Sequence, residues 1–87
     1  MGITRITATR EVCGKLLNKH AVEWYEVQEV MAEAVHPRRG KIVDGEQRYY
    51  VIGRTEAGRE LRVVFVMIGN DGIRVITAWG TRDKRKG

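Results

Sequence analysis

The sequence has few of the residues that hold disulfide-linked or metal-bound domains together. Of its 87 residues, one is cysteine, one is proline and two are histidine. A single cysteine, Cys13, cannot form an internal disulfide, and two histidines give no cysteine–histidine spacing of the kind that binds metal. The sequence therefore predicts a protein without a metal or another cofactor.

Long apolar runs are absent as well. The longest, residues 63–68, has the length of a strand and not the roughly 20 residues that cross a bilayer. The first residues lack the apolar core of a secretory signal. We therefore expect a cytoplasmic chain without membrane contact. At 87 residues it should form a single domain over residues 1–79, followed by a basic, mobile tail over residues 80–87.

The charges are unevenly distributed. Residues 21–37 carry four glutamates and no lysine or arginine, a net charge of −4. Because the whole chain has a net charge of +5, the rest of it carries +9. Such separation steers a polyanion to one side of a protein. The charge and the arginines placed among strand residues together indicate nucleic-acid binding, and an ordinary charge excess is the alternative.

The first half of the chain predicts one short strand and two helices. Residues 3–7 alternate as in a strand. Thr9 can cap a helix over residues 10–19, and a second helix is expected over residues 23–34, ending before Pro37. The second helix has an apolar stripe opposite its glutamates.

After Pro37 the pattern has a period of two. The turn signals Asp44-Gly45, Ala57-Gly58 and Asp71-Gly72 separate four strands near 38–43, 47–55, 60–68 and 73–79. Strands joined by such short loops are antiparallel. The sequence therefore predicts an α+β fold in the order β-α-α-β-β-β-β, with two helices packed on a twisted antiparallel meander sheet. Residues 61–68 should form a central strand because nearly all of them are apolar.

The register of the last two strands follows from the third turn. If Asn70 pairs with Ile73, Val66 lies opposite Thr77 and Val64 lies opposite Trp79. One face would then carry Val64, Val66, Val75, Thr77 and Trp79, and the other face Phe65, Met67, Arg74, Ile76 and Ala78.

Three residues are candidates for catalysis. Arg59 follows a turn at the mouth of the sheet and Arg74 lies early in the last strand, and both could bind a phosphate or stabilise a phosphorane. The alternative for Arg59 is an exposed position that keeps the hairpin end in solvent, and the alternative for Arg74 is an ion pair with a glutamate or aspartate. His20 could act as a general acid or base, or could interact with the end of its helix.

A further set could bind the RNA backbone or stack on a base. It comprises Lys19, Arg54, Arg62, Trp79, Arg82, Lys84 and Arg85. The alternative for Arg54 and Arg62 is an ordinary surface position in a strand, and the alternative for Trp79 is to cover the end of the sheet.

No carboxylate pair, glycine-rich phosphate loop or Ser-His-Asp order is present in the sequence. RNA cleavage suits a site made of arginines and a histidine. The 2′-hydroxyl of RNA is its own nucleophile, so the protein has to move protons and stabilise the phosphorane.

Three segments resemble the BrnT-type toxins, small ribonucleases of the RelE-like superfamily. Residues 18–22, Asn-Lys-His-Ala-Val, are similar to the helix junction of that family, with Ala21 where the family usually has glycine. Residues 53–65 resemble its central hairpin and residues 73–79 its last strand, with Trp79 in place of the usual arginine. The basic tail is shorter than the usual one.

The resemblance implies a RelE-like fold and an RNA-cleaving toxin of a type II toxin–antitoxin pair. It also implies RNA and a cognate antitoxin as partners, with self-association as an open alternative when the antitoxin is absent. The alternative function is a catalytically inactive relative that binds RNA or a protein partner through the same sheet surface.

Overall fold

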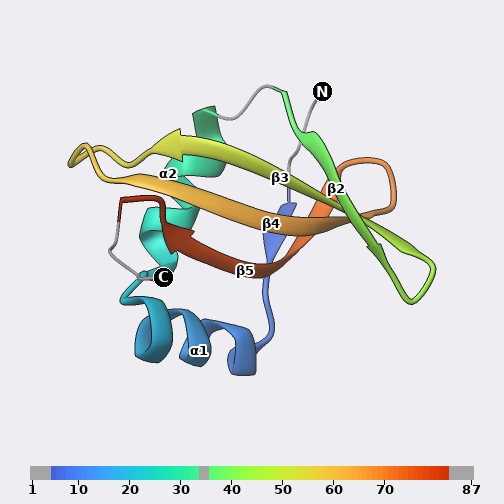
Figure 1. Cartoon of the computed structure of the whole chain (residues 1–87), viewed down its shortest axis with the longest axis horizontal. Coiled ribbons are helices and arrows are strands. Elements are labelled where there is room, and N and C mark those ends of the chain that lie inside the picture. Colours follow the sequence, from blue (N-terminus) through green and yellow to red (C-terminus); the bar gives the residue numbers. More distant parts are fainter. Residues whose placement is uncertain (1–4, 34–35, 83–87) are drawn as a thin grey trace.

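Five strands and two helices form the fold (Figure 1). The computed structural model describes residues 5–33 and 36–82. The elements are β1 (Arg5–Thr7), α1 (Arg10–His20), α2 (Trp24–Glu33), β2 (Arg38–Val43), β3 (Glu46–Arg54), β4 (Glu60–Ile68) and β5 (Gly72–Gly80). The predicted α+β order is confirmed. The expected tail residues 83–87, the end of the second helix at residue 34 and the strand start at residues 3–4 lie outside the described residues.

The strands form one sheet in the order β1-β5-β4-β3-β2, with β4 at its centre as predicted. Strands β2 to β5 are an antiparallel meander, but β1 runs parallel to β5, with Ile6 opposite Ile73. The sheet is therefore mixed, and the expectation of a purely antiparallel sheet is corrected. The parallel pairing depends on a long connection through both helices and the meander, and no local pattern reports it.

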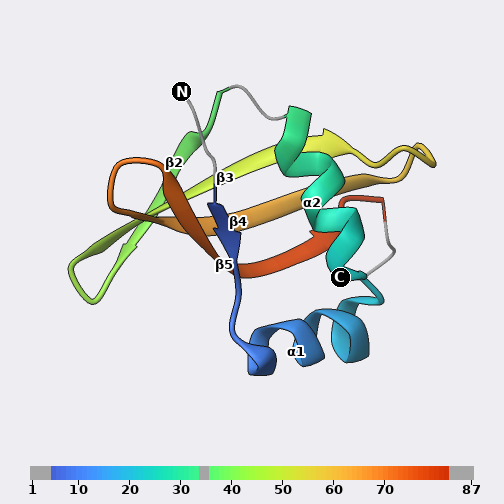
Figure 2. The same cartoon turned by 180° about the vertical axis from the view of Figure 1, so that it is seen from behind.

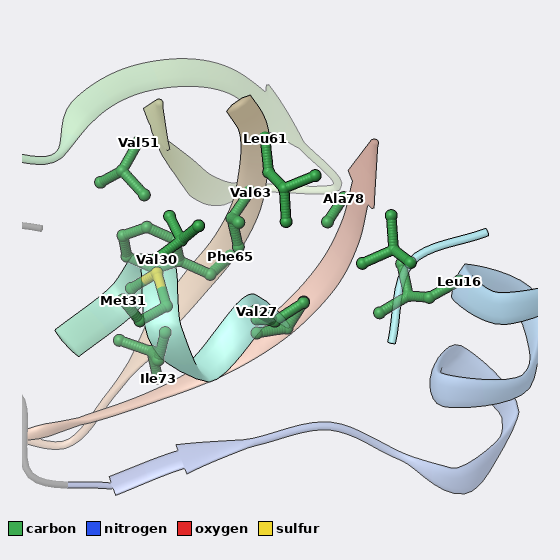
Figure 3. Close-up of a cluster of buried hydrophobic side chains, with 12 residues drawn as sticks. Leu16, Val27, Val30, Met31, Val51, Leu61, Val63, Phe65, Ile73 and Ala78 are labelled. Carbon is green, nitrogen blue, oxygen red and sulfur yellow. The ribbon is translucent and has the colours of Figure 1, made fainter. Parts of the chain in front are cut away.

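Both helices leave one face of the sheet uncovered. Figure 2 shows α2 in front of β3 and β4, whereas in Figure 1 the same helix lies behind them. Helix α1 lies beside β5, on the side of the sheet where the short β1 is the edge strand (Figure 1). Figure 3 shows the side chains of α2 pointing at the strands, and the core consists of Leu16, Val22, Val27, Val30, Met31, Val51, Leu61, Val63, Phe65, Ile73, Val75 and Ala78.

In the described part of the chain, no helix is long and apolar enough to cross a membrane.

Side-chain caps define both helices. The Thr9 hydroxyl accepts a hydrogen bond from the Val12 amide at 3.1 Å and begins α1, as predicted. Ala21 ends α1 in the left-handed region with φ 54°; its amide donates to the Leu17 carbonyl at 3.1 Å, and the Val22 amide donates to the Leu16 carbonyl at 3.0 Å. The carboxylate of Glu26 accepts from the Glu23 amide at 2.9 Å and caps the first turn of α2.

Two turns differ in how well the sequence predicts them. Asp44 and Gly45 have φ of 51° and 79°, which is the predicted two-residue turn with two left-handed residues. The Asp71-Gly72 prediction is wrong, because Gly69 takes the left-handed conformation (φ 63°) and Ile68 pairs with Gly72. Val66 therefore lies opposite Arg74, and Val64 opposite Thr77.

A β-bulge then confines the change of faces to the turn end of the β4–β5 pair. The register shifts by one between Val64 and Phe65 of β4, so that Arg62 lies opposite Trp79. On the turn side of the bulge, Val75 is buried opposite Phe65, although it was predicted on the face of Val64 and Trp79, and Arg74 is exposed, although it was predicted on the face of Phe65.

Gly53 sets the distance between α2 and the sheet. A Cβ atom at Gly53 would lie 3.1 Å from Val30 Cγ1, so Gly53→Ala should force the helix outward. We expect its free energy of unfolding to fall by about 1–3 kcal/mol. Gly14→Ala is the control, since a Cβ at Gly14 in α1 meets nothing within 4 Å. It should raise stability by about 1 kcal/mol. Urea denaturation that gives both variants the same sign of change would contradict this account.

Candidate nucleic-acid interface

The uncovered face of the sheet, which we call the open face, carries the candidate site. In β3, β4 and β5 the residues that alternate with the core positions face away from α2. Register and burial place Tyr50, Ile52, Arg62, Val64 and Trp79 side by side on this face. The open face is the front of the sheet in Figure 1.

Arg62 lies between two aromatic rings at the middle of the open face. Its guanidinium carbon lies 4.0 Å from the centre of the Tyr50 ring and 5.8 Å from that of Trp79. Cation–π stacking of this kind holds a guanidinium flat and leaves its N–H edges available. Within residues 5–33 and 36–82 no carboxylate lies within 4.0 Å of Arg62. The planar fork of N–H groups on such an arginine can donate two hydrogen bonds to the oxygens of a phosphate.

His20 extends this cluster beyond the edge of the sheet. It is the last residue of α1, and its ring centre lies 6.3 Å from that of Trp79 with an angle of 45° between the planes. The order His20, Trp79, Arg62, Tyr50 therefore forms a row that crosses from α1 to β3. An imidazole, a guanidinium and two aromatic stacking surfaces are groups that bind single-stranded RNA.

Arg59 fixes the end of α1 where His20 lies. Its Nη1 donates to the Ala21 carbonyl at 2.7 Å, and its Nη2 donates to the His20 carbonyl at 3.2 Å. The same Nη1 lies 3.2 Å from Oε1 of Glu26, a carboxylate that is almost fully buried. These bonds satisfy orphan carbonyls at a helix C-terminus, so the contacts of Arg59 are those of a positioning residue.

The two arginines predicted as catalytic do not converge. Arg59 precedes β4, whereas Arg74 lies opposite Val66 near the other end of that strand. Val66 lies six positions after Glu60 along β4, a distance of about 20 Å. Their assignment as a joint phosphate site therefore has no geometric support, and the catalytic role of either residue stays a prediction.

The other predicted RNA-binding residues divide by location. Arg54 and Arg82 line a shallow hollow of about 230 Å³ with Gly58, Arg59 and Glu60, at the end of the sheet beside the Arg62 row. Lys19 is exposed on the last turn of α1. Lys84 and Arg85 lie outside the described residues.

A groove lies on the other side of Arg62. It has a volume of about 280 Å³ and is lined by Lys41, Val43, Arg48, Arg62, Val64 and Trp79, which come from four strands. Three of the six are cations and none is acidic. The groove and the aromatic row share Arg62 and Trp79, so they form one continuous surface.

Sequence reasoning missed Tyr50, Arg48 and Lys41. It also placed Glu26 with the other glutamates on the face of α2 opposite the apolar stripe, but Glu26 is buried as the partner of Arg59. The alternation of Arg48, Tyr50 and Ile52 along β3 is the signal that places the first two on one face. The Glu26–Arg59 pair joins residues that lie 33 positions apart, and no local pattern indicates it. In the described part of the chain, no three histidine, cysteine or acidic side chains lie where they could hold a metal ion.

Comparison with known proteins identifies the fold. No protein-family model matches the sequence, and no curated protein is significantly similar to it. The structure is similar to the crystal structure of BrnT, a ribonuclease toxin from Brucella abortus, with a TM-score of 0.65. The match covers 92% of this chain and 100% of that chain at 13% sequence identity. The predicted fold is therefore confirmed as the fold of that toxin.

The Glu26–Arg59 pair gives a stability prediction. Arg59→Ala leaves a buried carboxylate and two helix-end carbonyls without their donor, so the free energy of unfolding should fall by about 2 kcal/mol. The full cost of a deeply buried pair is not expected, because 28% of the Arg59 side chain is exposed.

Arg74→Ala, which removes the same charge from an exposed position, should stay within about 0.5 kcal/mol of the parent. Adding Glu26→Gln to Arg59→Ala should restore part of the loss, because an amide is less costly to bury unpaired than a carboxylate. Thermal denaturation measures all three. Equal stability of the Arg59→Ala and Arg74→Ala variants would show that Arg59 does not hold α1.

Proposed function

We propose that this protein is an RNA-cleaving toxin whose open face binds single-stranded RNA. The observation that carries the proposal is Arg62, stacked between Tyr50 and Trp79 without a carboxylate partner in the described part of the chain. The fold shared with a ribonuclease toxin and the similarity of residues 18–22 and 73–79 to BrnT-type toxins support it.

The roles follow from the chemistry of each side chain. Arg62 binds the phosphate that is cleaved and stabilises its extra charge in the phosphorane. Trp79 and Tyr50 stack on the neighbouring bases. Their rings also hold the guanidinium of Arg62 in place, so the charge need not be reoriented during the reaction.

His20 supplies the proton transfer. The neutral imidazole removes the proton of the 2′-hydroxyl, the 2′-oxygen forms a bond to phosphorus, and the bond from phosphorus to the 5′-oxygen breaks. The departing 5′-oxygen takes a proton from the imidazolium or from water. The products are a 2′,3′-cyclic phosphate and a free 5′-hydroxyl, and no external nucleophile is required.

One observation favours the second candidate, RNA binding without cleavage. Arg59, which the sequence predicts as a catalytic residue, has its guanidinium bonded to two helix carbonyls and to Glu26. A site that relies on Arg62 alone for charge stabilisation would bind RNA and cleave it slowly.

The proposed partner is a cognate antitoxin acting in the cytoplasm. The open face is basic, and the exposed side of α2 carries Glu29 and Glu33. An acidic segment of the antitoxin gains charge complementarity on the open face and excludes RNA from it. Without that partner, self-association of the open face is the alternative.

The test compares binding and cleavage of a single-stranded RNA oligonucleotide. Arg62→Ala should weaken binding at least tenfold, since it removes both a phosphate contact and a stacked cation. His20→Asn should leave the dissociation constant within about twofold and lower the cleavage rate by about 10²–10⁴. Fluorescence anisotropy measures the first effect and gel analysis of the products the second.

Arg10→Ala is the matched control, because it removes one arginine from the exposed start of α1. If Arg62→Ala and Arg10→Ala bind RNA equally well, the open face is not the site. If the parent protein binds RNA tightly but releases no cyclic phosphate product, the second candidate replaces the first.

A further inference from the structure

The groove beside Arg62 is lined by three cations and by no acidic residue. Lys41 and Val43 of β2 line it together with Arg48 of β3, Arg62 and Val64 of β4, and Trp79 of β5. Its cations therefore come from three strands, while the lining contains no acid to neutralise them. In Figure 1 the strand β2 crosses in front of β3 at this end of the sheet.

Arg48 has an unfilled hydrogen-bonding position. Its Nε atom is buried and has no hydrogen-bond partner within residues 5–33 and 36–82. A buried donor without an acceptor costs roughly 1–3 kcal/mol. Such atoms are rare in native proteins, and a bound ion or water is one of the explanations for them. A phosphate in the groove would supply the missing acceptor after a small rotation of the Arg48 side chain.

The strand irregularity that places Lys41 is itself stabilised. The register between β2 and β3 shifts between Arg39 and Ile42, which is a β-bulge. The side-chain amide nitrogen of Gln47 donates across this shift to the Gly40 carbonyl at 2.9 Å, and within β3 to the Arg48 carbonyl at 2.8 Å. These hydrogen bonds fix the backbone of the bulge, and the bulge in turn fixes the position of Lys41 in the groove.

We infer that this groove is a second phosphate subsite, which binds the RNA backbone next to the nucleotides held at the Arg62 row. The inference rests on the proposed function, because Arg62 and Trp79 belong to both places. Val43 and Val64 provide an apolar wall for a sugar or a base face. Because Trp79 provides a stacking surface, the site favours a nucleic-acid strand over an acidic peptide. The preferred substrate is then a single strand long enough to reach from His20 to Lys41.

The test uses RNA oligonucleotides of three and of eight nucleotides that carry 2′-O-methyl groups. The methyl group removes the nucleophile, so binding is measured whether or not the protein cleaves RNA. Lys41→Ala with Arg48→Ala should weaken binding of the longer strand at least tenfold. It should also lower the magnitude of the salt slope of log K by about 1.4, since each contact contributes roughly 0.7.

The matched control is Arg10→Ala with Lys15→Ala, which removes the same charge from exposed positions of α1. It should stay within about twofold of the parent. Lys41→Gln alone changes an exposed residue and leaves Arg48 in place, so it does not disturb the hairpin. It should also weaken RNA binding, by less than the double variant.

Three outcomes would overturn the subsite. The first is an equal loss of binding in the groove variants and the control variants. The second is displacement of the longer strand by inorganic phosphate at a concentration equal to that of the phosphate groups in the RNA, which would show that the groove binds any phosphate ion. The third is tighter binding of a glutamate-rich peptide than of RNA by the parent, which would assign the groove to a protein partner. Failure of the parent to cleave unmodified RNA bears on the proposed reaction and leaves these binding results unchanged.

Discussion

The carboxylate of Glu26 is the interaction on which the arrangement of the site depends. It accepts from the Glu23 amide at the start of α2, and it lies 3.2 Å from the guanidinium of Arg59. That guanidinium in turn binds the carbonyls of His20 and Ala21. One buried acid therefore joins the beginning of α2, the end of α1 and the beginning of β4. The ring of His20 lies beside Trp79 because these three elements meet there.

The second constraint is that α2 covers one face of a sheet whose other face carries the cations. The exposed glutamates of α2 lie on the outer side of the helix layer, and Arg62 is on the open face. Its charge is compensated by aromatic rings and solvent, with no carboxylate nearby in the described residues. Such a cation can bind a phosphate without first breaking an ion pair. The separation of charge seen in the sequence thus becomes a separation between two faces of one small domain.

Local signals predicted much of the fold. Helix periodicity, the Thr9 cap and the Asp44-Gly45 turn depend on neighbouring residues, and each is confirmed. The third turn was predicted at Asp71-Gly72, but Gly69 offered a competing left-handed position, and the register followed that glycine. That register placed Val75 opposite Phe65 on the core face, and the bulge in the β4–β5 pair placed Arg62 opposite Trp79, neither of which alternation alone can show.

The site was predicted less completely, because its contacts are not local. The sequence marked His20, Arg62 and Trp79 separately, and only the sheet register brings them together. Arg59 was predicted to bind phosphate because it follows a turn, yet its acceptors lie on α1 and α2, more than 30 residues away in the sequence. Tyr50 was not assigned a role because its neighbours on the open face come from other strands.

The central claim is that RNA binds the open face, and the two tryptophans test it directly. Trp79 lies on that face, whereas Trp24 is partly buried against the core from α2. The indole N–H signals of both can be followed by ¹H–¹⁵N NMR during titration with a 2′-O-methyl RNA strand. The account predicts that the Trp79 signal shifts with saturation while the Trp24 signal stays in place. A shift of Trp24 with an unmoved Trp79 would place RNA on the helical face and contradict the account.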